Sequence, residues 1–388
     1  MTVDSDSPDP ENQMLQRHSP AAADFSMPAG QSFSFYPAGG GVMQPDSSVA
    51  VVILAAGYGK RMKSSLPKVL HPLGGVPLIE HSLRAAAQVS GQPPLLVIGH
   101  GAEQVRAAVG ERARYALQSQ QLGTAHAVRM AQPLLEGRAD WVVVTAGDMP
   151  LITADTLQRL IDLQRSADSA LTMLTVILDD PHGFGRVVRS PHGDVQAIIE
   201  EAVAPPEVLA IRELNAGVYC FDGAWLWQAL AEISLSPKGE YYLTDVVEIA
   251  RRHGRRVQAV TAADPHEALG INTRAHLAEA QAVLQRRIAA RWMEAGVTLI
   301  DPASTTIEVD VTIGADTIIY PHCYLGGSTQ IGGNCRIGPG AALWDTRVGE
   351  GCRIPAGWLE NCTLADGVRL SPYAVRRGGH ISAAESEA

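Results

Sequence analysis

The feature that most constrains the fold of this chain is a six-residue repeat in its C-terminal part. From position 307 a large aliphatic residue recurs at every sixth position, and after the loss of one residue near position 344 the repeat resumes. These positions are Ile307, Ile313, Ile319, Leu325, Ile331, Ile337, Leu343, Val348, Ile354, Leu364 and Leu370. Such hexads are typical of a parallel β-helix, in which each hexad forms one short strand and three strands make a triangular coil.

A second repeated position lies four residues after the aliphatic one. It is occupied by Val311, Thr317, Cys323, Thr329, Cys335, Ala341 and Cys352. Small side chains suit a tight interior corner, so these cysteines are expected to fill the core rather than to bind a metal. Cys335 and Cys352 lie one coil apart and are expected to stack. The five cysteines of the chain are too scattered for a disulfide scaffold, which predicts a reduced, cytoplasmic protein.

Upstream of the repeat, apolar strand-like runs alternate with amphipathic helical stretches. The strand-like runs are 49–56, 94–100, 141–148 and 169–177, and the helical stretches are 79–90, 103–109, 124–135 and 154–165. The alternation predicts an α/β domain over residues 48–275, with a mostly parallel sheet covered on both faces. Ligands of such domains bind at the carboxyl ends of the strands.

The other segments have distinct compositions. Residues 1–47 are rich in Ser, Pro, Gly, Asp and Gln and are expected to form a disordered extension. Residues 276–296 are expected to form a connector helix, residues 297–376 the β-helix, and residues 377–388 a polar tail.

Charge and hydropathy exclude two classes of partner. With 31 Lys and Arg against 41 Asp and Glu, the net charge is −10, which disfavours a general nucleic-acid binder. The longest apolar run, residues 49–56, is too short to span a bilayer, and the N-terminus shows no secretory signal. We therefore expect no nucleic acid and no membrane among the partners.

A candidate phosphate-binding loop follows the first buried strand. Gly57 and Gly59 allow a ligand to approach the backbone closely. Four cations follow within nine residues: Lys60, Arg61, Lys63 and Lys68. The spacing matches neither the Walker A loop nor the dinucleotide-binding motif. A solvated basic turn is the alternative interpretation.

The string Leu54-Ala55-Ala56-Gly57-x-Gly59-x-Arg61-Met62, followed by Pro67-Lys68, resembles the signature of the sugar nucleotidyltransferases. Continued through Val69-Leu70-His71, it is most similar to the bifunctional N-acetylglucosamine-1-phosphate uridylyltransferase and glucosamine-1-phosphate acetyltransferase branch. Further segments that agree with this branch are 121–127, 147–151, 183–186, 215–217 and 240–245. The resemblance covers about residues 49–375 and implies a Rossmann-like nucleotidyltransferase domain followed by a short left-handed β-helix.

The resemblance also implies a set of site residues. Those assigned to the nucleotide are Leu54, Ala55, Ala56, Gly57, Lys68, Gln118, Gly123 and Thr124. Those assigned to the sugar phosphate are Ala146, Gly147, Asp148, Gly185, Glu200, Asn215 and Asn272. Arg61 and Lys68 would be catalytic, because they neutralise the charge on the reacting phosphates. Asp148 and Asn272 would ligate Mg²⁺, which commonly takes only one or two protein oxygens.

Each of these polar residues has a purely structural alternative. Asp148 could cap the predicted helix over 154–165 or lie in a turn, and Asn272 could cap the connector helix. Glu200, which Glu201 follows, could belong to a solvated acidic edge. Asn215, before Ala-Gly, could be a turn residue.

The implied reaction is transfer of UMP from UTP to N-acetylglucosamine 1-phosphate. Substrate preference is less constrained, because Ala125, Ala146 and Glu201-Ala202 depart from the pattern of the family. A nucleotidyltransferase for another sugar 1-phosphate, such as glucose 1-phosphate with UTP or dTTP, is one alternative. A non-catalytic regulatory or scaffold subunit is another, although it predicts broken phosphate and metal positions.

The C-terminal part sets a further expectation. In this family the acetyltransferase site lies further along the β-helix, whereas here the hexads end near Val375. His322 and His380 match no acetyltransferase motif. We therefore expect no acetyl transfer by this chain, with a separate acetyltransferase supplying that step, and a β-helix that serves assembly as a homotrimer.

Overall fold

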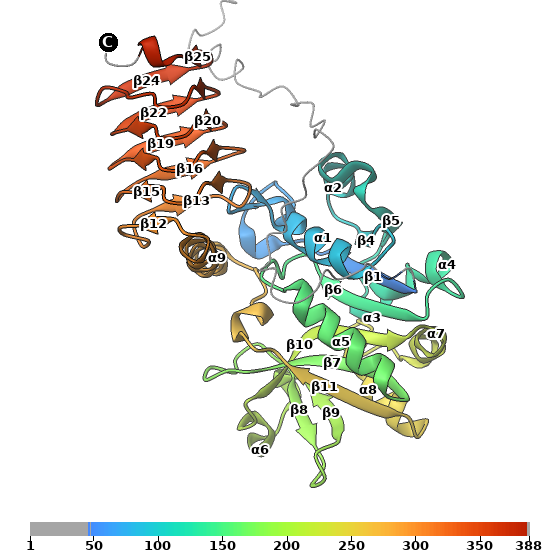
Figure 1. Ribbon diagram of the computed structural model, residues 1–388. Helices are drawn as coiled ribbons and strands as arrows, with labels where there is room; N and C mark the ends of the chain where they lie inside the picture. The colour runs from blue at the N-terminus through green and yellow to red at the C-terminus, as the bar shows by residue number, and fades with distance from the viewer. Residues whose placement is uncertain (1–45, 47, 386–388) are drawn as a thin grey trace, which may run out of the picture. The chain divides into compact units, whose positions relative to one another are not determined.

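The computed structural model describes Asp46 and residues 48–385 (Figure 1). The disorder predicted for residues 1–47 therefore concerns positions that lie, apart from Asp46, outside the described residues. The Asp46 carboxylate accepts a hydrogen bond from the Ser48 N–H at 2.8 Å and forms an ion pair with Arg165. This contact fixes the chain where it enters the first strand.

The α/β domain is built on a nine-stranded sheet whose main path runs β11-β7-β10-β6-β1-β4-β5. The strands of this path are β1 (Val49–Ala55), β4 (Leu95–Ile98), β5 (Arg114–Leu117), β6 (Trp141–Ala146), β7 (Ser169–Ile177), β10 (Glu213–Asp222) and β11 (Arg256–Thr261). Along the path only β10 runs against the others, because it pairs antiparallel with both β6 and β7. The hairpin of β8 (Arg186–Arg189) and β9 (Val195–Ile199) extends from β10. The predicted mostly parallel sheet is confirmed.

The central strands are apolar throughout because both faces of the sheet are covered. In β1, Val49, Val51 and Ile53 belong to one hydrophobic cluster, while Ala50 and Val52 belong to the other. The first cluster includes residues of α1 (Leu78–Val89), α2 (Ala102–Val109) and α5 (Ala154–Ser166). The second includes residues of α3 (Thr124–Arg129), α4 (Gln132–Leu135), α7 (Gly223–Glu232) and α8 (Val246–Arg252). This sandwich holds the ends of β1 and β6 rigidly.

The structure differs from the predicted helices at one place. The stretch 124–135 forms two helices, α3 and α4, instead of one. Pro133 lies in the first turn of α4, where its missing N–H costs nothing, but it could not continue a helix begun at Thr124. Smaller elements are β2 (Pro72–Leu73), β3 (Val76–Pro77) and α6 (Pro206–Leu209).

The hexads form a parallel β-helix after the connector helix α9 (Arg274–Glu294), as Figure 1 shows. The first face stacks β12 (Thr298–Leu299), β15 (Ile318–Ile319), β18 (Arg336–Ile337) and β21 (Arg353–Ile354). The second face stacks β13 (Thr306–Ile307), β16 (Tyr324–Gly326), β19 (Ala341–Trp344), β22 (Gly357–Glu360) and β24 (Ala374–Arg377). The third face stacks β14 (Thr312–Ile313), β17 (Gln330–Ile331), β20 (Arg347–Val348), β23 (Thr363–Leu364) and β25 (His380–Ile381).

The interior of the β-helix follows the predicted repeat closely. The cysteines at the small position are buried, and the pairing of Arg336 with Arg353 places Cys335 and Cys352 in adjacent coils. The hydrogen bond between these two thiols lowers the pKa of Cys335 and raises the pKa of Cys352.

Two details of the last coils correct the prediction. Leu370 is only half-buried, and the buried residue of that rung is Val368, which lies four residues after Leu364 at the second repeated position. The ladder also extends beyond position 376, since His380–Ile381 pairs with β23 in the segment expected to be a polar tail. No helix within residues 48–385 combines the length and hydropathy of a membrane span.

Candidate active site

Three residues from distant parts of the chain converge next to the end of β6. Lys68 begins the short helix η3 (Lys68–Leu70), Asp148 follows β6, and Asn272 precedes α9. The Lys68 ammonium forms an ion pair with the Asp148 carboxylate and donates a hydrogen bond to Asn272 Oδ1 at 3.0 Å. The Lys68 and Asp148 side chains are only 14% and 21% exposed. These contacts join residues that lie 80 and 204 positions apart.

The helix caps remove one structural explanation for Asp148 and Asn272. The N-cap of α5 is Thr153, whose side chain accepts a hydrogen bond from Thr156 N–H. The N-cap of α9 is Thr273, whose side chain accepts from His276 N–H. Neither Asp148 nor Asn272 is therefore needed as a cap, and both present an oxygen to the same ammonium group.

This pair of oxygens suits a small hard cation. Within the described part of the chain there is no cluster of three or more His, Cys, Asp or Glu that could hold a metal. Asp148 and Asn272 supply one carboxylate and one amide oxygen, and both already contact one positive charge, that of Lys68. Mg²⁺ prefers oxygen ligands and needs few from the protein, so the residues present fit this ion.

The glycine-rich loop folds back toward Lys68. Leu54 O, at the end of β1, accepts a hydrogen bond from Gly147 N–H at 2.9 Å, so the loop 54–57 lies beside the segment that carries Asp148. Gly59 has φ 59°, and a Cβ added there would lie 2.8 Å from Lys68 Cβ. A side chain at this position would displace Lys68. Arg61, in the short helix η2 (Lys60–Met62), is exposed and lies outside the contacts of the Lys68 cluster described above.

The residues assigned to uracil also lie together. Gln118 is buried and donates from Nε2 to Gly123 O at 3.1 Å. Thr124 Oγ1 accepts a hydrogen bond from Leu243 N–H at 3.0 Å. Gly123 has φ 101°, and a Cβ there would lie 2.6 Å from Tyr241 O. The segment 241–243, part of the Glu-Tyr-Tyr-Leu-Thr-Asp motif, therefore supports this loop.

The residues assigned to the sugar form a third group. Gly185 O accepts a hydrogen bond from Asn215 N–H at 2.9 Å. Glu200 Oε1 accepts one from Thr244 Oγ1 at 3.3 Å. The Asn215 side chain donates to Tyr219 Oη at 2.8 Å and accepts from Gly217 N–H at 3.1 Å, so it also serves the turn expected from the sequence.

Glu201 has a role that the sequence analysis did not identify. Its carboxylate accepts hydrogen bonds from Gly183 N–H at 2.8 Å and from His182 Nδ1 at 2.9 Å. The bond from His182 lowers the pKa of Glu201, and the same bond raises the pKa of His182. The buried Arg186 lies 3.4 Å from the same carboxylate. Glu201 thus anchors the loop that leads to Gly185, which no local pattern in the sequence indicates.

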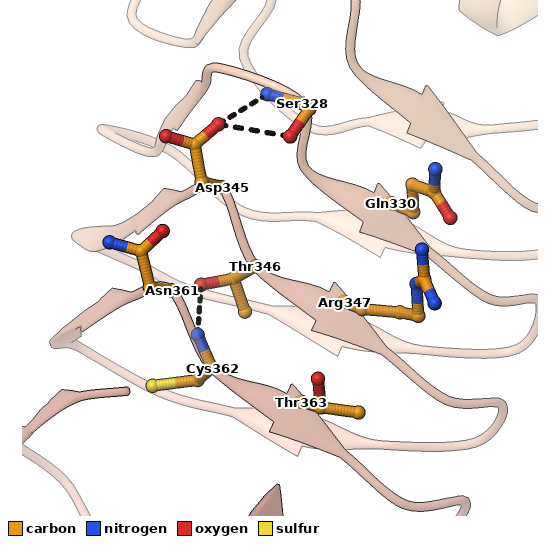
Figure 2. A pocket seen from close by; sticks show the side chains of 8 residues that line it. All are labelled: Ser328, Gln330, Asp345, Thr346, Arg347, Asn361, Cys362 and Thr363. Carbon is orange, nitrogen blue, oxygen red and sulfur yellow. Dashed lines mark hydrogen bonds between the residues drawn. The ribbon is translucent and has the colours of Figure 1, made fainter. Parts of the chain in front are cut away.

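A surface hollow of about 300 Å³ lies elsewhere, on the β-helix (Figure 2). It is lined by Ser328, Gln330, Asp345, Thr346, Arg347, Asn361, Cys362 and Thr363. Asp345 accepts hydrogen bonds from both the N–H and the hydroxyl of Ser328, at 2.8 and 3.0 Å. None of the candidate site residues contributes to this hollow, so it does not bear on their assignment.

Comparisons with known proteins identify the family of the chain. The family described as MobA-like NTP transferase domain matches residues 51–201, and the bacterial transferase hexapeptide repeat matches residues 310–343. The bifunctional protein GlmU of Heliobacterium modesticaldum is 47% identical over 329 residues, which cover 84% of this chain and 72% of that protein. The chain belongs to the GlmU family. It is an enzyme with a nucleotidyltransferase domain of Rossmann-like fold, followed by a left-handed β-helix.

Other members and one solved structure extend the comparison. GlmU of Corynebacterium glutamicum is 46% identical over 342 residues, covering 86% of this chain and 70% of that protein. A Bacillus anthracis structure assigned as a glucose-1-phosphate thymidylyltransferase has a TM-score of 0.51 at 20% identity, covering 61% of this chain and 95% of that one. At that identity the likeness shows the shared fold alone.

Proposed function

We propose that this chain transfers UMP from UTP to N-acetylglucosamine 1-phosphate, giving UDP-N-acetylglucosamine and pyrophosphate. The observation that carries the proposal is the convergence of Lys68, Asp148 and Asn272 beside the loop 54–57. A cation, a carboxylate and an amide oxygen are brought together where a parallel sheet of this kind binds ligands. Membership of the GlmU family supports the choice of reaction.

In the proposed reaction a phosphate oxygen of the sugar phosphate attacks the α-phosphorus of UTP in line. The bond from that phosphorus to the oxygen bridging the α- and β-phosphates breaks, and pyrophosphate leaves. The nucleophile is already an anion, so no residue needs to remove a proton. The work of the site is positioning and charge neutralisation, which we assign to Lys68 and Arg61.

We propose that Asp148 and Asn272 hold Mg²⁺ when the substrates are bound. The ion would neutralise charge on the transferred phosphate and on the departing pyrophosphate. Lys68 occupies the space between the two oxygens in this structure, so its ammonium is placed to move onto phosphate oxygens while Asp148 and Asn272 remain in position.

We assign selection of the base and selection of the sugar to the other two sets of residues described for the site. Gln118 and the backbone of Gly123 and Thr124 can offer both donors and acceptors to uracil. Glu200 can accept from sugar hydroxyls, while the N–H of Gly185 and the amide of Asn215 can donate. Glu201 braces the loop that leads to Gly185, which supports the proposal of a preorganised sugar site there.

Release of pyrophosphate by the purified chain tests the proposal. UTP and Mg²⁺ are held constant, and N-acetylglucosamine 1-phosphate, glucosamine 1-phosphate and glucose 1-phosphate are compared in parallel. We expect release with the acetylated sugar alone. A preference for glucose 1-phosphate would contradict the assignment of the sugar site and leave the reaction class in place.

We also propose that these 388 residues transfer no acetyl group. His322 lies in a turn of an early coil, and His380 is exposed on the last strand. Adding acetyl-CoA to the glucosamine 1-phosphate arm tests this. Rescue of pyrophosphate release there would contradict the proposal.

The β-helix suggests how copies of the chain associate. Tyr324, Trp358 and Val375 lie in register on the second face of the β-helix and are 38%, 44% and 61% exposed. We propose that this apolar face packs in a homotrimer, which light scattering of the purified protein would test. The five cysteines are all free thiols, which supports a reducing, cytoplasmic location.

A further inference from the structure

We infer that Glu267 is a positioning residue that sets the separation of Asp148 and Asn272 and thereby tunes divalent-cation binding. The inference rests on the proposed function, because it concerns the two residues to which we assign Mg²⁺. Glu267 touches neither of them. It acts through the two loops that carry them.

The two loops meet at several points. The Asp148 loop leaves β6 and enters α5 at Thr153, and the Asn272 loop leaves the short helix η7 (Pro265–Ala268) and enters α9. Their backbones are joined by a hydrogen bond from Ile271 N–H to Asp148 O at 2.8 Å. One such bond fixes a point of contact but leaves the loops free to rotate about it, so a second attachment is needed to define the geometry.

Glu267 provides that second attachment. Its Oε2 accepts hydrogen bonds from Thr153 N–H at 3.0 Å and from Thr153 Oγ1 at 3.1 Å, and its Oε1 accepts one from Thr156 Oγ1 at 3.1 Å. The residue is 3% exposed. Burial raises the pKa of the Glu267 carboxyl, and the hydrogen bonds from Thr153 and Thr156 oppose that rise.

A third attachment comes from helix α9. Arg287 donates to Leu151 O at 2.8 Å and forms an ion pair with Asp264 at 2.6 Å. Leu151 belongs to the Asp148 loop and Asp264 lies just before η7. The segment after Asp148 and the segment before Asn272 are thus joined at three places. Of the acidic residues that make these contacts, Glu267 is the buried one.

Groups that orient metal ligands without touching the metal typically change affinity by about 10–100-fold when removed. Glu267→Ala deletes all three acceptor contacts and is expected to raise the half-saturating Mg²⁺ concentration about 10-fold. Glu267→Gln keeps the volume, and its amide can still accept from Thr153 and donate to Thr156 Oγ1. The Gln variant is therefore expected to restore Mg²⁺ dependence close to that of the wild type.

A matched control lies at the other end of α5. Gln164 is also fully buried and makes three hydrogen bonds, to Ser169 O at 2.8 Å, from Ser169 Oγ at 3.1 Å and from Thr172 Oγ1 at 2.8 Å. Gln164→Ala should lower thermal stability as Glu267→Ala does, because it also leaves buried groups unpaired. It should leave the half-saturating Mg²⁺ concentration unchanged, since it is far from both loops.

The experiment measures two quantities in each variant. The first is the Mg²⁺ dependence of uridylyl transfer, and the second is the rise in Tm that Mg²⁺ causes in the presence of UTP, which reports binding without turnover. We expect Glu267→Ala to weaken both and Gln164→Ala to weaken neither. Thr156→Val keeps the shape of the side chain and removes two hydrogen bonds, one donated to Glu267 and one accepted from Arg159. It should give an intermediate shift even if Glu267→Ala does not fold.

Two negative results are distinguishable. If Glu267→Ala and Thr156→Val lower Tm but keep the wild-type response to Mg²⁺, Glu267 is structural only and the inference is overturned. If the wild-type chain shows no Mg²⁺-dependent transfer and no Mg²⁺-dependent rise in Tm, the proposed function fails, and this inference fails with it.

Discussion

Lys68 Nζ lies 3.0 Å from Asn272 Oδ1, although 204 positions separate the two residues. Asp148 contacts the same ammonium, so three loops that carry unlike chemistry meet at one point. β1 and β6 are adjacent parallel strands, so the segment after β1 lies beside the segment that carries Asp148. The hydrogen bond from Ile271 N–H to Asp148 O at 2.8 Å brings Asn272 to the same place.

Lys68→Ala is expected to lower kcat/KM by about three orders of magnitude, because it removes a fixed positive charge from the reacting phosphates. Thermal unfolding should show that the domain remains folded. Lys60, which is exposed and stacks on Tyr58 at 5.2 Å from the ring centre, is the matched control. A near-normal rate for Lys68→Ala, or an equal loss for Lys60→Ala, would remove Lys68 from the mechanism.

Gly123→Ala is expected to raise KM for UTP strongly, since its Cβ would lie 2.6 Å from Tyr241 O at φ 101°. The loop must then move away from segment 241–243. Gly137 has a similar positive φ of 69°, but nothing lies within 4 Å of the Cβ that Gly137→Ala would add. This variant therefore measures the effect of backbone strain without a steric clash. Steady-state kinetics of both variants measure the difference. Equal KM values would refute the role of this close packing.

Asn215→Ala is expected to raise KM for the sugar phosphate about 10-fold and to leave KM for UTP unchanged, as loss of one hydrogen bond to a charged or polar ligand predicts. Tyr219→Phe distinguishes a direct contact of Asn215 with the sugar from a role of Asn215 in bracing the turn. It removes only the hydroxyl to which the Asn215 amide donates. If Tyr219→Phe reproduces the full change in KM, Asn215 acts by bracing the turn and not by contacting the sugar.

His81 makes stability depend on pH. Burial lowers its pKa from 6.5 to about 4, and its Nε2 contacts Leu73 O at 3.0 Å. Because the folded chain holds the neutral form, the unfolded chain takes up the proton first as the pH falls. The free energy of unfolding should therefore be fully retained above pH 6.5, fall by roughly 3 kcal/mol between pH 6.5 and 4, and level off below.

The comparison variant for this prediction is His81→Gln, which can still donate to Leu73 O but does not titrate. Urea unfolding across this pH range should show a smaller fall for the variant. Parallel curves for the two proteins would show that the acid sensitivity arises elsewhere.

Ile337→Ala is expected to reduce the free energy of unfolding of the β-helix by about 2–5 kcal/mol, because its side chain is fully buried and the rigid coil leaves a cavity. The rate of uridylyl transfer should not change, since Ile337 lies in the hexads and not in the α/β domain. Calorimetry and a rate assay at a temperature below the first transition check both parts. Loss of activity without loss of stability would contradict this separation.

The parts of the fold that the sequence predicted are those with a strong local period. The hexads placed the aliphatic core and the stacked pair Cys335 and Cys352 correctly, because each coil repeats the same environment. The runs that became β1, β4, β6 and β7 were recognisable because a strand buried on both faces is apolar throughout. The strands β5, β10 and β11 were missed, since they are short or mixed in character and depend on their neighbours in the sheet.

The candidate site, too, was predicted from the sequence only in part. Motif resemblance singled out Lys68, Asp148 and Asn272, and the structure brings them together. It could not reveal that Glu201 braces the loop of Gly185, or that Glu267 joins Thr153 and Thr156. Those contacts are made between residues that are 18 and 114 positions apart, and neither position carries a local signature. Long-range hydrogen bonds of this kind become visible only when the chain is folded.

The most direct test of the central claim is the formation of UDP-N-acetylglucosamine from UTP and N-acetylglucosamine 1-phosphate, followed by mass spectrometry of the product for the wild type and for Asp148→Asn. We expect Mg²⁺-dependent product from the wild type. We expect little or no product from Asp148→Asn, which keeps the shape of the side chain and removes its charge. Equal product from both proteins would contradict the assignment of the Lys68, Asp148 and Asn272 cluster as the site of transfer.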